Sequence, residues 1–353
     1  MPPIPTNVTI TPVPTQPVLT NTANAAIGTF SGTIPLFYED MVTLVERMGE
    51  LRLSALGDEQ VSLVDPDSKE AVSKQVESPS QTTTKIPITG VWVRGFGSGA
   101  RIDNGVSREF DQQVGGVQLG VDRRLSAFSG DLFVGLFVGY LYASRDFLDG
   151  GDGSTNGLTI GGYATWIHPQ GWYADLVSKY SELWNYFSTP TTGGTLSNGH
   201  YNIPAFGGSL EVGRRFDFAK HRYFVEPEAQ LGGAWASSMS YQATNGLRVH
   251  GNDQYSLRGR LGLRAGMLLP LGAGRVIEPY VIASVIHEFE TGNQVETNTT
   301  PFNNNLTGTI GRFGAGVATR IASSLDLYAE YDYSTSDKIS EPWAVDVGVR
   351  WAW

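Results

Sequence analysis

From Gly90 to the end of the chain, hydrophobic and polar residues alternate with a period of two. The run from 254 to 268 places apolar side chains on one face and arginines on the other (Leu257, Leu261 and Leu263 against Arg258, Arg260 and Arg264). In the preceding run, Glu226 and Glu228 alternate with Val225 and Ala229. Successive side chains of a β-strand point to opposite faces, so this period predicts strands with one apolar and one polar face.

The alternation predicts twelve strands, near residues 91–98, 114–123, 131–143, 157–167, 171–183, 202–215, 222–236, 254–268, 275–289, 306–320, 324–335 and 343–353. Most reach the roughly 9–11 residues with which a tilted strand crosses a bilayer. Short turns are expected to alternate with long polar loops near 99–113, 144–156, 184–201, 237–253 and 290–305. This alternation, with tryptophans near strand ends, is typical of outer-membrane barrels.

An even number of strands allows the sheet to close. Unpaired backbone amides are costly in hydrocarbon, so a sheet crosses a bilayer only when it leaves no free edge. The predicted fold class is therefore all-β: a 12-stranded antiparallel transmembrane β-barrel over residues 90–353 with its polar face toward the lumen. A soluble antiparallel barrel or sandwich is the alternative, and it would bury the apolar face instead.

Three segments precede the predicted barrel. Residues 1–35 are rich in Pro, Thr and Asn, which predicts an extended linker, and residues 57–89 look like a second linker. Residues 36–56 show helical spacing of their apolar side chains (Met41, Leu44, Val45 and Met48). The same helix carries charges that exclude contact with lipid (Glu46, Arg47, Glu50 and Arg52). A barrel of this size encloses a channel, so we expect the α-helix to lie inside the pore and to make polar contacts through these charges.

Composition excludes several functions. The chain has 25 Lys and Arg against 35 Asp and Glu, a formal net charge of −10, which argues against nucleic acid as a partner. It has no Cys, which excludes thiol catalysis and cysteine-based metal sites. The histidines show no ligand spacing, and no G-x-S-x-G motif occurs. The GFGSGA run (Gly95–Ala100) has dinucleotide-like spacing but leads into a loop instead of a helix. We expect no catalytic residue, metal site or cofactor.

Several blocks of sequence resemble the translocator, or beta, domain of autotransporters (type V secretion), and specifically its pertactin-like group. They include LVERMGELRL (Leu44–Leu53), VWVRGFG (Val91–Gly97), REFDQ (Arg108–Gln112), GGYATW (Gly161–Trp166), EPYVIASVIHEFE (Glu278–Glu290) and LYAEYDYS (Leu327–Ser334). The resemblance runs from about residue 36 to the end. It implies a barrel in the outer membrane of a Gram-negative bacterium, which delivers its own N-terminal passenger to the cell surface and keeps a helix in its pore. Residues 1–35 would then derive from the passenger or its linker.

The resemblance also implies particular sites. The last strand places Val349, Trp351 and Trp353 on one face, which looks like the C-terminal signal read by the outer-membrane assembly machinery. Some relatives release the passenger when an asparagine side chain attacks its own backbone carbonyl. Asn24–Ala25 would be that junction here, although no asparagine is expected inside the helix. The charged residues of the polar strand faces are expected to line the lumen (Glu226, Glu228, Arg258, Arg260 and Arg264).

The expected partners are the chain's own passenger, the outer-membrane assembly machinery, the lipid bilayer and lipopolysaccharide, and the barrel is expected to be a monomer. Two alternatives stay open: an outer-membrane barrel enzyme, such as a protease or esterase, and a passive porin. An enzyme would have to use His200 or His250 in the external loops. A porin would conduct freely, whereas a plugged translocator would conduct little. The first residues lack a secretory signal, so an exported protein would be longer than this chain.

Overall fold

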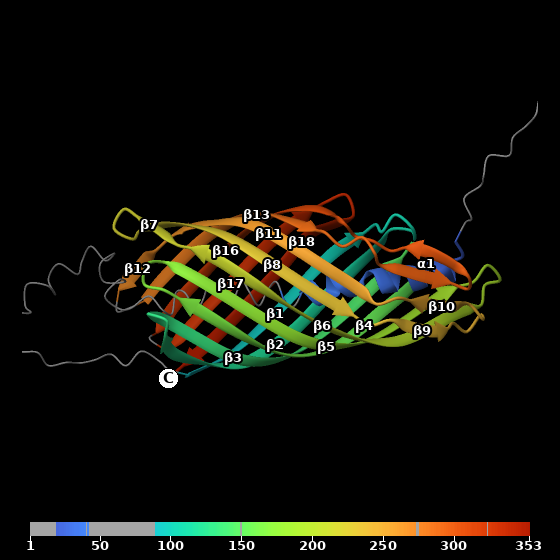
Figure 1. The fold of residues 1–353 in the computed structure, drawn as a ribbon, viewed down its shortest axis with the longest axis horizontal. Coiled ribbons are helices and arrows are strands. Elements are labelled where there is room, and N and C mark those ends of the chain that lie inside the picture. The colour runs from blue at the N-terminus through green and yellow to red at the C-terminus, as the bar shows by residue number, and fades with distance from the viewer. Residues whose placement is uncertain (1–18, 40, 42–88, 149, 273–274, 323) are drawn as a thin grey trace, which may run out of the picture.

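The computed structural model describes residues 19–39, 41, 89–148, 150–272, 275–322 and 324–353. Within these ranges, twelve long antiparallel strands form a closed barrel, which confirms the predicted fold class (Figure 1). They are β1 (Thr89–Ile102), β2 (Phe110–Ala127), β3 (Gly130–Phe147), β4 (Gly151–Ile167), β5 (Trp172–Pro190), β6 (Leu196–Arg214), β8 (Tyr223–Ala236), β11 (Gln254–Met267), β13 (Arg275–Glu288), β16 (Gly308–Ala322), β17 (Leu325–Thr335) and β18 (Ile339–Ala352). Each pairs with its neighbours in chain order, and β18 pairs with β1 to close the sheet.

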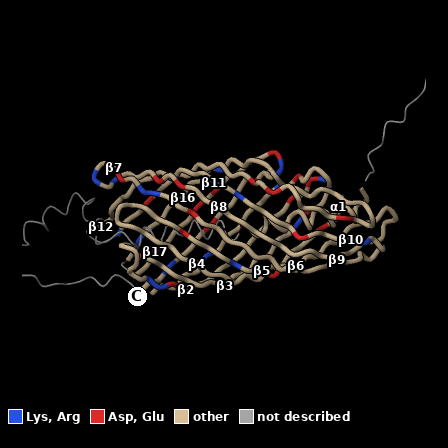
Figure 2. The backbone as a smooth tube through the Cα atoms, viewed as in Figure 1, with Lys and Arg blue, Asp and Glu red and all other residues tan. Residues whose placement is uncertain are grey.

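The wall has the orientation expected of a membrane barrel. Leu261 on the outer face is 70% exposed, whereas its neighbour Arg260 on the inner face is 8% exposed. The same contrast holds for Leu263 against Arg264. Most of the backbone in Figure 2 belongs to uncharged residues. The period of two thus separates a lipid-facing surface from a charged lumen. No helix in the described part of the chain is long and apolar enough to cross a membrane.

The two ends of the barrel differ. At the end that we call the turn end, the connections are short and carry two small strands, β7 (Phe216–Phe218) and β12 (Leu269–Gly272), and the chain ends there (Figure 1). At the opposite, loop end, β9 (Met239–Gln242), β10 (Arg248–Gly251), β14 (Gln294–Thr297) and β15 (Thr300–Asn303) form a separate four-stranded sheet. Two predicted long loops, 237–253 and 290–305, build this sheet, which we call the cap sheet.

The strands extend further toward the loop end than the sequence pattern predicts. Residues 144–156 were expected to be a loop, yet β3 continues to Phe147, β4 begins at Gly151, and Ser144 pairs with Ser154. Residues 184–201 likewise belong mostly to β5 and β6. Beyond the lipid, outward side chains need not be apolar, so the alternation stops while the backbone hydrogen bonds continue.

The helix of the pore begins earlier than expected. Residues 1–35 were expected to be extended, but α1 spans Asn21–Ser31, and residues 33–39 and 41 are also helical. The Thr20 hydroxyl caps α1 by accepting a hydrogen bond from the backbone N–H of Ala23 at 3.2 Å. Small, uncharged residues made the segment look like a linker, whereas burial on all sides by the lumen stabilises it as a helix. The helical residues expected at 42–56 and the second linker, 57–88, lie outside the described residues.

Candidate functional site

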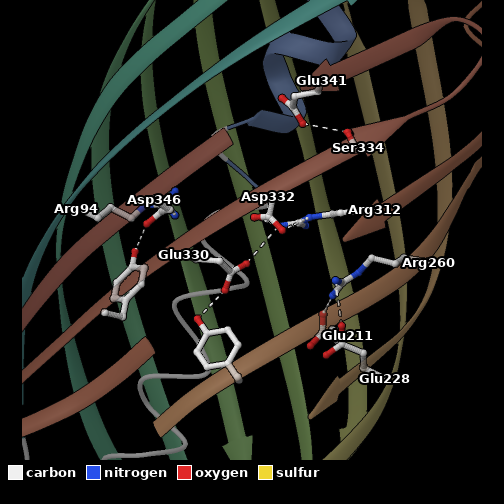
Figure 3. A network of polar contacts seen from close by, with 12 residues as sticks. Arg94, Glu211, Glu228, Arg260, Arg312, Glu330, Asp332, Ser334, Glu341 and Asp346 are labelled. Carbon is white, nitrogen blue, oxygen red and sulfur yellow. Dashed lines mark hydrogen bonds and ion pairs between the residues drawn. The ribbon is translucent and has the colours of Figure 1, made fainter. Parts of the chain in front are cut away.

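A ladder of ion pairs lines the lumen. Arg260 contacts Glu228 at 3.0 Å and also pairs with Glu211 (Figure 3). Arg258 contacts Glu288 at 3.0 Å. Neighbouring strands contribute the partners of the Arg258–Glu288 and Arg260–Glu228 pairs, because register places acidic and basic inner-face residues side by side. Glu211 lies one strand further away, on β6. All five residues expected to line the lumen lie on the inner face, and their charges are compensated there.

Arg264 takes part in contacts that reach across two strands. It lies directly across from Glu226 in the β8–β11 register. Its guanidinium also contacts Glu278 at 3.7 Å and lies over the ring of Tyr280, with 3.6 Å between the guanidinium carbon and the ring centroid. Glu226 contacts Arg215 at 3.3 Å. Arg215 also contacts Glu278 at 3.0 Å, so the carboxylates of β8 and β13, the two strands that flank β11, share arginines in an arrangement that one strand's sequence does not reveal.

Sequence reasoning missed further pairs of the same ladder. They are Arg94 with Asp346 at 3.3 Å, Arg350 with Asp122 at 2.7 Å, and Arg312 with Asp332 at 2.7 Å. Figure 3 shows the first and third of these beside Arg260 and its glutamates. The sequence could have indicated these pairs, since each of these charged residues stands on the polar side of a run in which polar and apolar residues alternate. The lumen at this level is thus closely occupied by charged side chains.

The segment after α1 is held by residues that the sequence analysis did not single out. Lys179 on β5 donates to the carbonyl of Phe37 at 2.5 Å, and its ammonium lies 3.8 Å from the centroid of the Phe37 ring. Tyr38 is hydrogen-bonded to Ser256 at 3.1 Å and lies under the Arg258 guanidinium, 3.9 Å from ring centroid to guanidinium carbon. A charge-assisted hydrogen bond and two cation–π contacts therefore dock this segment on the wall.

Glu39 makes a different contact with the wall. It accepts a hydrogen bond from the Ser98 hydroxyl at 2.9 Å and is hydrogen-bonded to Glu341 of β18. Two carboxyl groups can share a hydrogen bond only when one of them is protonated. The contact between the pore segment and β18 therefore includes a proton.

At the loop end, α1 is enclosed by the wall and the cap sheet. Asn21 donates to the carbonyl of Pro190 at 3.0 Å, and Asn245 donates to Thr22 at 2.9 Å. Phe30 is fully buried, and a side chain on Gly251 of the cap sheet would collide with its ring, 2.5 Å away. The N-terminal end of α1 thus lies at the loop end, beneath the cap sheet.

The cap sheet is anchored where its first loop leaves and rejoins the barrel. Asp253 accepts hydrogen bonds from the backbone N–H of Ser238 at 2.7 Å and from the indole N–H of Trp235 at 3.2 Å. The hydrogen bond from Ser238, followed by that from Trp235, lowers the pKa of Asp253. A carboxylate therefore ties the two ends of residues 237–253 together at neutral pH.

The contact between α1 and the wall is closest at Gly32. A Cβ atom there would lie 2.6 Å from Gln112 Oε1 and 2.7 Å from Arg145 Nε. Arg145 is fully buried and donates to Gln112 at 2.8 Å and to Thr155 at 2.7 Å. Only glycine leaves room for the backbone to pass this arginine.

The predicted cleavage junction lies within the helix. Asn24 is 5% exposed and belongs to α1, contrary to the expectation that the pore helix contains no asparagine. Its Oδ1 accepts from the backbone N–H of Arg108 at 3.0 Å, and its Nδ2 donates to the carbonyl of Leu19 at 3.4 Å. Ala25, its neighbour across the predicted junction, is fully buried.

The remaining predicted residues divide into two groups. Val349, Trp351 and Trp353 lie at the end of the chain, where β18 pairs with β1, and both tryptophans are exposed. The four charges expected to hold the helix lie outside the described residues (Glu46, Arg47, Glu50 and Arg52). The described residues contain no cluster of His, Asp and Glu able to hold a metal ion.

The fold and the lumen define the class: a membrane-spanning β-barrel whose pore holds a segment of its own chain. The family model described as "Autotransporter beta-domain" matches residues 91–332, and this chain belongs to that family. It is an outer-membrane protein of a Gram-negative bacterium.

Relatives fall within the same family. The pertactin autotransporter of Bordetella bronchiseptica is 35% identical over 347 residues, covering 97% of this chain and 34% of the relative. The BrkA autotransporter of Bordetella pertussis is 34% identical over 265 residues, covering 74% of this chain and 26% of the relative. The chain thus spans about a third or less of the length of these relatives.

Solved structures show the same barrel. The crystal structure of the beta domain of the Bordetella autotransporter BrkA has a TM-score of 0.64 at 32% identity, covering 75% of this chain and all of the solved one. The translocator domain of the autotransporter NalP from Neisseria meningitidis has a TM-score of 0.59 at 15% identity, covering 85% of this chain and 99% of that one, which shows the fold alone.

Proposed function

We propose that this chain is the translocator part of an autotransporter and delivers the polypeptide that precedes residue 19 to the cell surface. The observation that carries the proposal is the direction in which the chain is threaded. Asn21 and Thr22 contact the loop end, whereas Tyr38 and Glu39 contact the wall further along the lumen. Anything attached before α1 therefore emerges at the loop end, the outer side of barrels with this alternation of loops and turns.

The structure of the lumen and loops fits passenger transport better than it fits a passive porin or a barrel enzyme. A passive porin needs an open lumen, and here α1 and the ion-pair ladder occupy it. A barrel enzyme would need partners for a loop histidine. Among the described residues, His250 is hydrogen-bonded to Ser240, at 2.7 Å. Glu296 lies across from His250 in the β10–β14 register but makes no hydrogen bond to its imidazole in the described structure, and a hydrolase triad requires a carboxylate that orients the histidine through such a bond. We infer that the barrel itself has no enzymatic turnover, and that it works as a monomer.

A reporter fusion tests the direction of delivery. A small folded reporter placed before residue 19 of the full chain, expressed in a Gram-negative host, should be degraded by protease added to intact cells. The matched control carries the same reporter in the turn between β7 and β8, at the turn end, which leaves the end of β18 unchanged, and it should stay protected until the outer membrane is opened. Protection of the first fusion in intact cells, with a barrel that is folded by heat-dependent gel mobility, would contradict the proposal.

We further propose that Asn24–Ala25 is the junction at which the passenger is released. Burial in the lumen and the two hydrogen bonds hold the Asn24 amide in one orientation beside its own backbone. Attack of Nδ2 on the Asn24 carbonyl carbon forms a cyclic imide, breaks the peptide bond to Ala25 and transfers a proton to the departing amine. The intact mass of a fusion should then show a product that begins at Ala25, and Asn24→Ala should abolish it. Asn21→Ala is the control and should leave cleavage unchanged, so cleavage that persists in Asn24→Ala would refute the assignment.

The end of β18 is proposed as the assembly signal. Val349, Trp351 and Trp353 present an apolar face on the strand that closes the barrel against β1. Before closure this strand has a free edge, which an assembly factor can capture by strand addition.

We also propose that the lipid bilayer and lipopolysaccharide are partners of the outer face of the barrel. The lumenal ion pairs and the charges at 46–52 are proposed to hold the pore segment.

A further inference from the structure

The outer face of the barrel carries an apolar groove beside the seam where β18 meets β1. It has a volume of about 670 Å³ and is lined by residues of five adjacent strands, β18, β1, β2, β3 and β4, among them Val91, Val121, Leu136 and Val349. This volume falls within the roughly 300–1,000 Å³ typical of ligand sites. Leu136 is 68% exposed, so the groove faces the surroundings of the barrel and not its lumen.

An arginine lies on the same outer face, next to the groove and closer to the turn end. Arg123 follows Val121 at the next outward position of β2, about 7 Å along the strand. It is exposed, and within the described part of the chain its side chain makes no hydrogen bond or ion pair. Apolar side chains continue beyond it toward the turn, at Leu125 and at Phe128, which is 80% exposed.

An unpaired guanidinium between apolar neighbours is costly on a lipid-facing wall. An outward arginine costs roughly 2–4 kcal/mol at the bilayer midplane and about 0–1 kcal/mol near the interface. The neighbouring side chains indicate that Arg123 lies near the interface. The rings of Trp351 and Trp353 are in contact at a tilt of 41°, with 5.0 Å between their centroids. Thr89, which pairs with Arg123, makes backbone hydrogen bonds with Trp353. Tryptophan prefers the depth of the lipid headgroups.

We propose that this face is a binding site for one glycerophospholipid, with an acyl chain in the groove and the phosphate on the Arg123 guanidinium. The planar guanidinium matches phosphate oxygens through two parallel hydrogen bonds. The site lies at the turn end, at the level of the headgroups of that leaflet. It requires a barrel in a membrane and is independent of passenger delivery, so a negative result here leaves the proposed function untouched.

Native mass spectrometry of the full chain, purified in mild detergent, tests the site. Dioleoyl phosphatidylglycerol is the probe, and dioleoylglycerol, which lacks the phosphate, is the comparison. The wild-type chain should retain one phosphatidylglycerol per barrel and should not retain the diacylglycerol at the same concentration. Arg123→Gln should weaken retention about tenfold, the loss expected for a charge-assisted hydrogen bond. Arg222→Gln, which removes a charge from the turn between β7 and β8, should retain the lipid like the wild type.

A second variant tests the groove with the arginine intact. Val121→Phe fills the groove from β2 and should also weaken retention at least severalfold, while heat-dependent gel mobility reports that the barrel is folded. Equal retention by Arg123→Gln and wild type, or equal binding of the diacylglycerol, would overturn the proposal. A mass that shows two chains and no lipid would assign the face to a second copy instead.

Discussion

Lys179 provides the sharpest test of how the pore segment is held. Lys179→Met keeps the volume of the side chain but removes the donor to the Phe37 carbonyl and the cation beside the Phe37 ring. A hydrogen bond from a charged group contributes about 1.5–3 kcal/mol, and a desolvated cation–π contact contributes about 2 kcal/mol. One ammonium makes both contacts, so the two values overlap, and we expect a loss of about 2–4 kcal/mol in docking free energy.

The expected readout is conductance in a planar bilayer. Since about 1.4 kcal/mol corresponds to a factor of ten, the undocked population should rise roughly 30- to 700-fold. Wild-type channels should be closed almost all the time, and Lys179→Met channels should open in frequent bursts. Tyr180→Phe, on the outer face of the same strand, is the matched control and should behave like the wild type. A variant lacking residues 1–60, which removes the whole expected pore helix, defines the fully open conductance. Lys179→Met channels as quiet as the wild type, in bilayers where the truncated variant conducts, would refute the role of Lys179.

Three further predictions concern the same segment and the chain end. Gly32→Val should raise the open probability, because its side chain collides with Gln112 and Arg145, and single-channel recording measures this. Glu39 and Glu341 share a hydrogen bond only while one carboxyl is protonated, so docking should weaken and conductance should increase as the pH rises, and Glu39→Gln should abolish this pH dependence. Trp353→Ser should slow insertion of newly made barrels into the outer membrane, followed by pulse-chase and heat-dependent gel mobility, and insertion at the wild-type rate would count against the assembly signal.

The barrel could be predicted from the sequence because lipid imposes a simple pattern on its wall. Leu261 and Arg260 illustrate the rule, since one faces hydrocarbon and the other faces charged partners. Apolar and polar residues alternate along a strand wherever contact with lipid requires one of its faces to be apolar. Toward the loop end this selection ends, and the extra length of β3 and β4 was therefore missed.

The start of the pore helix could not be predicted for a different reason. α1 has no charged residue and many small ones, so its sequence resembles a linker. Its helical state comes from enclosure by the lumen, with Phe30 against the cap sheet and Gly32 against Arg145. These contacts join residues far apart in the chain, and no local pattern contains them. The same applies to Lys179, whose partner Phe37 lies 142 residues away.

The position of α1 in the lumen, with its first residues toward the loop end, is the central claim, and a disulfide cross-link tests it most directly. The chain has no cysteine, so an introduced pair reports only on itself. Asn245 at the loop end donates to Thr22 in the first turn of α1 at 2.9 Å, so Thr22→Cys with Asn245→Cys brings two thiols close together. Oxidation in intact outer membranes should link this pair and leave the pair of Thr22→Cys with Ser324→Cys, at the turn end, unlinked. Failure of the first pair to cross-link, or efficient cross-linking of the second, would contradict the account.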